Sequence, residues 1–199
     1  DTVGFVRDLP HDLVAAFRRG LRLVCQRRPG CPAAQRREDA VALLQRTARR
    51  LSARPVRGFG LDGDGNLRPV TLDDDALAQI AGSSYYSYAV WKDILAAAVA
   101  LDRGDAVPML RLGAEHLSFD AGEAVPADFS DPLYLAVTCH DYPQLWSPDT
   151  PIAKRAEEVA ARLGGYPLGT FTPFTAESWT SYPYEGPLAC LRWPSPTGG

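Results

Sequence analysis

The spacing of apolar side chains predicts that most of this chain folds into helices. Between positions 9 and 28, apolar residues recur three and four residues apart, which places them along one face of a helix. Similar patterns, with acidic residues or glycines at their ends, predict further helices. These lie at about 35–53, 73–82, 85–102, 105–117 and 152–163.

A different pattern, with a period of two, occupies positions 55–72. Two short alternating runs flank the sequence Asp-Gly-Asp-Gly-Asn at 62–66, whose residues favour a tight turn, so we expect one β-hairpin. The same five residues resemble the beginning of a calcium-binding loop. An EF-hand, however, needs glycine at its sixth position and glutamate at its twelfth. Those positions hold Leu67 and Asp73, so the hairpin is favoured.

The remaining segments show less regular patterns. Positions 118–132 are polar and hold two prolines, and we interpret them as a loop. The apolar run at 133–139 fits either a buried strand or the beginning of a helix. Aromatic residues and prolines from about 165 to 199 indicate a C-terminal aromatic linker. The sequence thus predicts one mainly α unit over residues 1–199 with a small hairpin, and without the strand–helix alternation that builds a parallel sheet.

Composition and charge are those of an ordinary globular protein. Of the 199 residues, 46% are hydrophobic and 23% are charged, and the net charge at pH 7 is −3. This balance argues against a nucleic-acid partner, which requires a basic surface. The longest apolar stretch, 94–101, is far too short to span a membrane. The chain begins with Asp1 rather than methionine and ends in a proline-rich stretch, so we interpret it as a segment of a longer protein.

Four cysteines leave more than one pairing open. Cys25 and Cys31 flank a Pro-Gly sequence that can turn the chain and bring their sulfur atoms together, which leaves Cys139 and Cys190 as the second pair. We favour this arrangement among the three possible connectivities. Four free thiols in a cytosolic protein are the alternative, and a zinc site is less favoured because the usual ligand spacings are absent. Two disulfides would indicate an oxidising compartment.

The sequence contains no recognisable active site of its own. A serine hydrolase places its nucleophile in Gly-x-Ser-x-Gly, because glycines permit the sharp turn at the serine. The nearest match is Gly-Ser-Ser-Tyr-Tyr at 82–86, where Tyr86 replaces the second glycine and would crowd the turn. His11, His116 and His140 are scattered, and a surface or structural role is favoured for each. Phosphate-binding and nucleotide-binding motifs are absent as well, so we expect no cofactor and no metal.

Asp141 is the one polar residue in a setting that suggests binding. It follows the apolar run at 133–139, two residues after Cys139. If Cys139 bonds to Cys190, the Asp141 carboxylate lies near a disulfide with aromatic residues around it. A carboxylate held in such a place could bind an ammonium group. A helix N-cap or an exposed loop acid is the alternative interpretation.

Four short motifs occur in a fixed order along nearly the whole chain. They are a cysteine pair followed by proline at 25–32, Ala-x-Asp-Arg-Gly-Asp followed by proline and leucines at 100–112, Leu-Ala-Val-Thr-Cys-His-Asp-Tyr-Pro at 135–143, and Cys-x-x-Trp-Pro at 190–194. In their order and spacing they resemble the tripeptidyl and prolyl aminopeptidases, which are serine hydrolases of the α/β-hydrolase fold. The resemblance implies that this segment is the helical cap, or lid, over the active site, and that it lacks the hydrolase sheet.

The resemblance also divides the functional residues between this chain and the rest of a secreted or cell-envelope parent protein. The nucleophilic serine would precede position 1, and the catalytic Asp and His would follow position 199, so no triad residue is assigned here. In related enzymes an acidic cap residue binds the free amino terminus of the peptide substrate, a role that Asp141 would take. Candidate wall residues of the pocket are the aromatic residues Tyr85, Tyr86, Trp91 and Trp146, for which core packing is the alternative.

Two other functions fit the sequence. An esterase or lipase-like enzyme of the same fold would use a similar cap without an amine-binding carboxylate. A non-catalytic helical binding module, stapled by disulfides, would contact a partner through its aromatic C-terminal segment. A large uncovered apolar surface favours either cap, because a cap buries one face on the catalytic domain of its parent chain.

Overall fold

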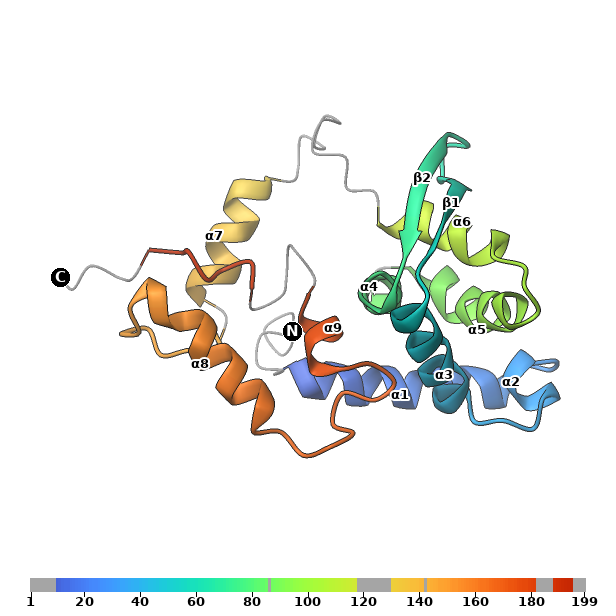
Figure 1. The fold of residues 1–199 in the computed structure, drawn as a ribbon, viewed down its shortest axis with the longest axis horizontal. Coiled ribbons are helices and arrows are strands. Elements are labelled where there is room, and N and C mark those ends of the chain that lie inside the picture. Colours follow the sequence, from blue (N-terminus) through green and yellow to red (C-terminus); the bar gives the residue numbers. More distant parts are fainter. Residues whose placement is uncertain (1–9, 86, 118–129, 142, 182–187, 195–199) are drawn as a thin grey trace.

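The structure is a computed structural model that describes residues 10–85, 87–117, 130–141, 143–181 and 188–194 (Figure 1). Within these residues the chain is mainly helical with one antiparallel hairpin, which confirms the predicted fold class. None of the described helices is both long and apolar enough to cross a membrane. The elements are α1 (Pro10–Arg27), α2 (Pro32–Gln35), α3 (Ala40–Ala53), β1 (Val56–Leu61), β2 (Leu67–Leu72), α4 (Asp74–Gly82), the 3-10 helix η2 (Ser83–Tyr85), α5 (Tyr88–Asp102), α6 (Val107–His116), α7 (Asp131–Asp141), α8 (Ile152–Gly164) and α9 (Ala176–Thr180).

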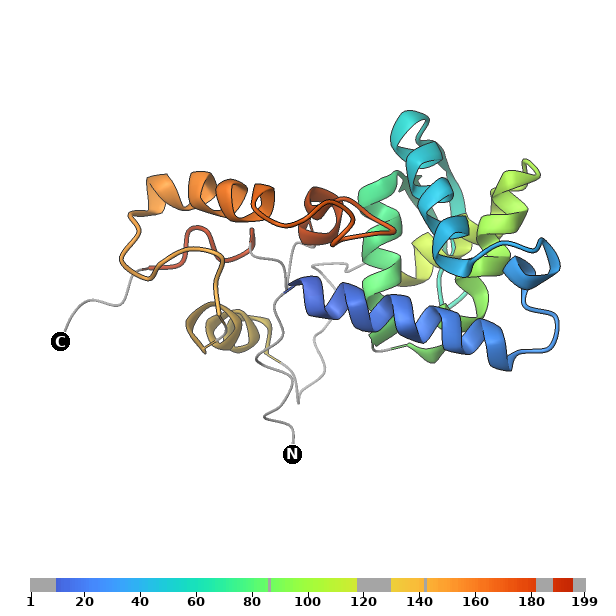
Figure 2. The same ribbon diagram turned by 90° about the horizontal axis from the view of Figure 1, so that it is seen from below.

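The helices form two groups with separate hydrophobic cores (Figures 1 and 2). The large lobe comprises residues 10–117 together with the segment 169–181, which carries α9. The small lobe comprises α7, α8 and the C-terminal segment 188–194. The core of the large lobe is lined by aliphatic side chains from five helices, including Leu21, Leu44, Leu77, Ile94 and Leu112.

Helix boundaries follow the capping chemistry of the sequence. α3 begins just after Asp39, whose carboxylate accepts hydrogen bonds from two backbone N–H groups of the first turn. The expected start near position 35 is therefore wrong, and residues 32–35 form the separate helix α2, which begins at proline. At α4 the Asp73 carboxylate caps the helix and Gly82 is its last residue, as the sequence predicts.

Two segments that the sequence left undecided or irregular contain helices. The apolar run at 133–139 lies within α7, so the helical alternative is correct. The expected aromatic linker at 165–199 contains α9, whose first turn is capped by the side chain of Thr175. Most of the loop expected at 118–132 lies outside the described residues, and α7 begins inside its expected range.

Glycines allow the hairpin to lie directly against α6. Gly58 and Gly60 of β1 face this helix, and a Cβ atom added at Gly60 would overlap the carbonyl oxygen of Leu110. A strand and a helix backbone can approach so closely only where the side chain is a hydrogen atom. Val70 and Leu72 of β2 are buried on the same side of the hairpin.

The turn of the hairpin at 62–66 is closed by the side chain of Asp62. Its carboxylate accepts hydrogen bonds from the backbone N–H groups of Asp64 and Asn66, and from Nε of Arg68 at 2.8 Å. The hydrogen bond from Arg68 is the main reason that the pKa of Asp62 falls to about 2. In the described part of the chain, no group of three or more His, Cys, Asp or Glu side chains is arranged to hold a metal ion.

The opposite face of the hairpin, which we call the outer hairpin face, is apolar and uncovered. Phe59, Leu61 and Leu67 expose 63%, 52% and 64% of their surface. Pro69 lies beside them, because it pairs with Phe59 in the ladder. Apolar groups of this size gathered on one exposed face are typical of a surface that contacts another molecule or domain.

Replacing Gly60 by alanine should destabilise the large lobe by about 1–3 kcal/mol, because the new methyl group must push β1 away from the α6 backbone. Gly63→Ala, in the turn of the same hairpin, is the matched control, since a Cβ atom there meets nothing within 4 Å. Urea unfolding followed by circular dichroism measures both free energies of unfolding. Equal values for the two variants would contradict the close packing of β1 on α6.

The last residue of α6, His116, has a buried Nε2 atom without a hydrogen-bond partner among the residues that the structure describes. The carboxylate of Glu115 lies 4.0 Å from it. Burial lowers the pKa of His116 below its usual value of 6.5, and this effect outweighs the opposing effect of the carboxylate. The folded protein therefore favours the neutral imidazole.

Acidification should destabilise the protein through His116, because the unfolded chain binds the proton more tightly than the folded one. The contribution of neutral His116 is fully present above about pH 6.5 and is lost as the pH falls towards the lower pKa of the folded state. Chemical unfolding at pH 7.5 and pH 5.5 measures this loss, and His116→Gln should reduce it. His140→Gln, at an exposed histidine, is the control. A loss that His116→Gln leaves unchanged would assign the acid sensitivity to other groups.

Candidate functional site

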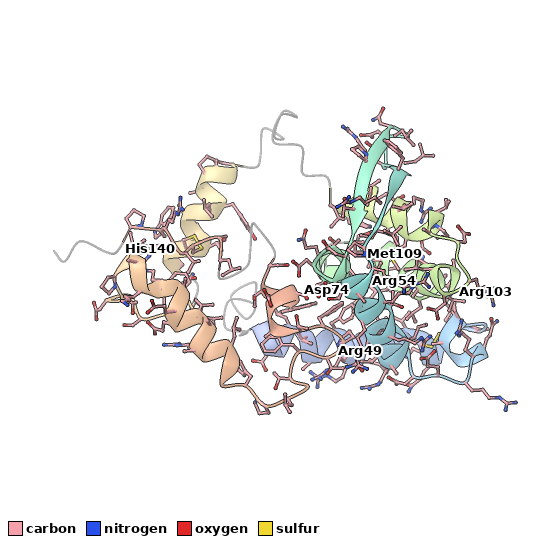
Figure 3. All side chains as sticks on the ribbon, viewed as in Figure 1. Arg49, Arg54, Asp74, Arg103, Met109 and His140 are labelled. Carbon is pink, nitrogen blue, oxygen red and sulfur yellow. A yellow bond between two sulfur atoms is a disulfide. The ribbon has the colours of Figure 1, made fainter. Side chains whose placement is uncertain are left out.

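The disulfide between Cys139 and Cys190 joins α7 to the C-terminal segment of the small lobe (Figure 3). It links residues 51 positions apart in the sequence, and their Cα atoms are 5.2 Å apart. A second disulfide, between Cys25 and Cys31, closes the short loop after α1. The favoured pairing is therefore confirmed, and the alternative of four free thiols is wrong. Two disulfides are typical of proteins in oxidising compartments.

A buried arginine completes the core beside the long-range disulfide. Arg155 of α8 is 2% exposed, and its Nε donates to the carbonyl oxygen of Thr150 at 3.1 Å. Its Nη1 donates to the carbonyl oxygens of Leu191 and Trp193 at 3.3 and 2.5 Å. The guanidinium group also lies over the ring of Trp146, 5.5 Å from the centroid. The C-terminal segment is thus linked to α8 by hydrogen bonds and to α7 by the disulfide.

Asp141 is the last residue of α7, so it is not a helix N-cap. Its side chain is 59% exposed, and its Oδ1 lies 2.8 Å from Nδ1 of His140, which Figure 3 labels in the small lobe. The carboxyl end of a helix carries partial negative charge. Because the Asp141 carboxylate adds to this charge, the end of α7 attracts a positively charged group.

An apolar stripe leads along α7 to this carboxylate. Leu133 and Val137 are 65% and 37% exposed, although both are aliphatic. They stand eight and four residues before Asp141, a spacing that places all three on one side of a helix. We call this surface the outer α7 face. The i, i+4, i+8 spacing could have revealed it from the sequence, had the segment been assigned to a helix rather than left open between helix and strand.

The aromatic residues proposed as pocket walls do not form one surface. Trp91 belongs to the large lobe, where its ring stacks on Phe17 at 5.1 Å and its Nε1 donates to a backbone oxygen seven residues before it. Trp146 is buried in the core of the small lobe, the same lobe that carries the end of α7. Tyr86 and the side chain of Tyr85 lie outside the described residues. Of these four, only Trp146 is placed in the lobe that holds the carboxylate.

The serine segment that partly matches a nucleophile motif has a different local structure. Ser83 and Ser84 lie in η2 between two helices, and the Ser83 hydroxyl donates to a carbonyl oxygen of α4 at 3.1 Å. A nucleophile elbow instead requires a strand before the serine. His116 and His140 lie in different lobes, and the side chain of His11 lies outside the described residues.

Aromatic stacking and a hydrogen bond fasten the segment 169–181 to the large lobe. The rings of Phe174 and Trp179 stack at 5.5 Å, and both lie 6.1 Å from the ring of Phe17 in α1. A serine hydroxyl of α9 donates to the Asp74 carboxylate at 2.6 Å. The sequence interpretation missed this docking, because it assigned the segment to a linker. The clustered aromatic residues were the available signal.

Comparisons of the chain with family models, curated proteins and solved structures gave no match.

Replacing both Cys139 and Cys190 by alanine should destabilise the small lobe by about 4 kcal/mol, the chain-entropy value for a crosslink across 51 positions. The matched control replaces Cys25 and Cys31, which lie in the other lobe. Their separation of 6 positions corresponds to a stabilisation of about 2 kcal/mol. Hydrogen exchange of the α8 amides, resolved by mass spectrometry, measures the effect. Faster exchange in α8 is expected for the first variant only, and equal exchange in both would contradict this assignment.

Proposed function

We propose that this chain is the cap domain of a secreted serine hydrolase of the α/β-hydrolase fold, and that the parent enzyme is an exopeptidase that releases short peptides from free amino termini. The cap contributes part of the substrate pocket, while the nucleophile and the rest of the triad belong to another domain of the parent. The observation that carries the proposal is the end of α7, where the exposed Asp141 follows an uncovered apolar stripe. The disulfide links the two family-like motifs, 135–143 and 190–194, at this place.

Asp141 supplies the charge that an amino-terminal ammonium group requires. Its carboxylate accepts charge-assisted hydrogen bonds, and the negative end of α7 strengthens the attraction. His140, with its Nδ1 as the donor, holds the carboxylate at the end of the helix. Leu133 and Val137 contact apolar side chains of the bound peptide. Peptide bonds far from the amino terminus are not cleaved, because an internal residue has no free α-ammonium group to bind at Asp141.

The catalytic step itself uses residues outside this chain. A serine attacks the scissile carbonyl, the peptide C–N bond breaks and the C-terminal part of the substrate leaves as a protonated amine, so that an acyl-enzyme forms. Water then hydrolyses the ester and releases the amino-terminal peptide. The cap fixes the amino terminus at Asp141, so that a peptide bond a short distance along the substrate reaches the serine. It also limits the access of bulk water to the reacting groups.

The uncovered apolar surfaces fit a domain that rests on another domain of its own chain. The outer hairpin face and the outer α7 face both expose aliphatic or aromatic side chains, whereas each lobe has a well-buried core of its own. A cap must bury one surface on the catalytic domain and present another to the substrate. We assign the outer hairpin face to the first contact and the outer α7 face to the second.

The extracytoplasmic location of the parent enzyme rests on the disulfides. Both bonds, Cys25–Cys31 and Cys139–Cys190, link residues within one lobe. Bonds of this kind persist outside the reducing cytosol. A secreted or cell-envelope enzyme meets extracellular peptides, which agrees with an exopeptidase activity.

Asp141→Asn in the parent enzyme should raise KM for tripeptide substrates with a free amino terminus by about 10- to 100-fold, with little change in kcat. This range corresponds to the loss of a hydrogen bond to a charged group. Asp141→Glu keeps the charge and should retain most of the binding. The measurement is steady-state hydrolysis of free and amino-blocked tripeptides by each variant.

Asp149→Asn is the matched control, because it removes an exposed carboxylate that lies outside α7, in the segment between α7 and α8. It should leave KM unchanged. Equal cleavage of blocked peptides or of simple esters would contradict the exopeptidase proposal and favour the cap of an esterase-like enzyme. A parent protein without any hydrolase activity, and without labelling by a fluorophosphonate probe, would favour a non-catalytic binding module.

A further inference from the structure

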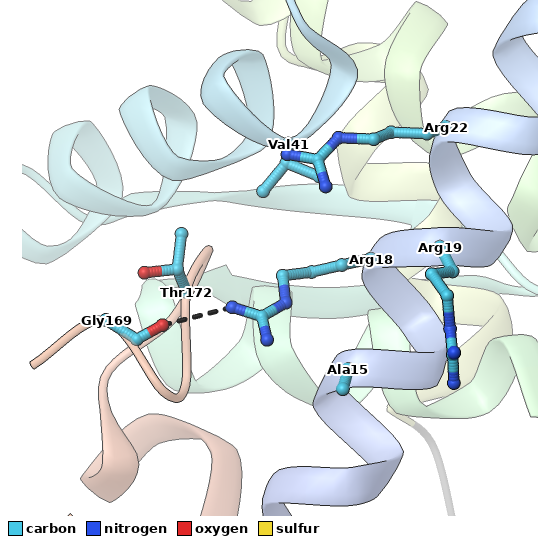
Figure 4. Close-up of a pocket in the computed structure, with 7 residues that line it drawn as sticks. All are labelled: Ala15, Arg18, Arg19, Arg22, Val41, Gly169 and Thr172. Carbon is cyan, nitrogen blue, oxygen red and sulfur yellow. Dashed lines mark hydrogen bonds between the residues drawn. The ribbon is translucent and has the colours of Figure 1, made fainter. Parts of the chain in front are cut away.

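A cavity of about 430 Å³ lies where α1 and α3 meet the segment that leads into α9 (Figure 4). Ala15 and Val41 supply aliphatic atoms to its lining, and Thr172 contributes a hydroxyl group from the segment 169–181. Three arginines of α1 line the same cavity. Its size suits a small molecule or the head of a larger one.

Two of these arginines extend from the same side of α1, one helical turn apart. In Figure 4, Arg18 reaches towards Gly169 and Arg22 reaches towards Val41. Arg18 donates through Nη1 to the carbonyl oxygen of Gly169 at 3.1 Å. Arg22 uses Nε and Nη2 for the carboxylate of Asp39, at 2.8 and 3.3 Å. These contacts fix both guanidinium groups and leave each with further N–H donors.

The positive charge at the cavity is only partly balanced by the protein. Of the three arginines, Arg22 alone has an acidic partner within the described part of the chain, which is Asp39. Arg46 and Arg50 of α3, and Arg36 before it, by contrast share the carboxylate of Asp102. An anion that enters the cavity is therefore attracted by the charge of Arg18, which has no acidic partner among the described residues.

We propose that this cavity binds a phosphate group, held by the guanidinium groups of Arg18 and Arg22 and by the hydroxyl of Thr172. The donors come from two elements that line the same cavity, and guanidinium groups bind phosphate oxygens through charge-assisted hydrogen bonds. The aliphatic atoms of Ala15 and Val41 contact the carbon chain next to the phosphate. The same chemistry is found in a soluble phosphate ester and in the headgroup of an anionic phospholipid. The site is separate from the end of α7 and does not depend on the proposed hydrolase activity.

Isothermal titration of the chain with glycerol 3-phosphate tests the soluble form of this ligand, against sodium chloride of equal ionic strength. Sedimentation with vesicles of phosphatidylglycerol and phosphatidylcholine, against phosphatidylcholine alone, tests the lipid form. Binding of glycerol 3-phosphate without vesicle binding identifies a soluble ligand. Vesicle binding that glycerol 3-phosphate displaces identifies a headgroup.

Three variants locate the binding in the cavity. Arg18→Gln and Arg22→Gln should each weaken it about tenfold or more, because each removes a charged donor. Thr172→Val keeps the size of the side chain and removes only the hydroxyl, so a loss of a few-fold is expected. Arg103→Gln is the control, since Arg103 lies at the far end of the large lobe, beyond α5 (Figure 3).

Circular dichroism of each variant shows whether it folds, because Arg18 and Arg22 also make contacts within the protein. Thr172→Val keeps the test valid if either arginine variant fails to fold. The proposal is contradicted if neither probe binds beyond the chloride control. It is also contradicted if folded cavity variants bind as well as Arg103→Gln does. Either result leaves the proposed function of the small lobe unaffected, since no hydrolysis is measured.

Discussion

The small lobe depends on one covalent constraint, the disulfide between Cys139 and Cys190. Its buried core is small, and a core of that size cannot offset the conformational entropy of ordering two helices and a terminal segment. The disulfide removes much of that entropy from the unfolded chain. Arg155 adds to this constraint, because it donates hydrogen bonds to the carbonyl oxygens of the C-terminal segment and lies over the ring of Trp146. The position of Asp141 at the end of α7 follows from the same constraint, two residues away from the sulfur.

The large lobe was the part that the sequence could predict, because its helices are amphipathic and bury one face in a common core. Its helix ends were predictable where a capping side chain stood alone, as at Asp73. The start of α3 after Asp39 was not predictable, since α2 begins at a proline seven residues earlier and the helical pattern of the two helices runs together in the sequence. α7 was harder for a different reason. It is apolar on the side that faces the small core and apolar again at Leu133 and Val137, so no single apolar face marks it as a helix.

The sequence predicts the candidate site only in part, for the same reason that it predicts the helices only in part. The proximity of Asp141 to Cys139 could be read from the sequence, and so could the disulfide partner. The separation of Trp91 and Trp146 into different cores could not, because it follows from tertiary packing. The docking of α9 joins Ser178 to Asp74 across 104 positions, and no local pattern encodes such a contact. The cavity with Arg18 and Arg22 exists only because that docking brings residues 169–172 against α1.

The contact of Gly60 with the α6 backbone also has a mechanical consequence. With no side chain between them, the strand and the helix have no soft layer that could deform, so they must move as one rigid body. A displacement of Phe59 or Leu67 at the outer hairpin face then moves α6 and, because α6 packs on α5, moves α5 as well. A domain or molecule bound to the outer hairpin face can thus set the orientation of the whole large lobe, because the hairpin and α6 move together.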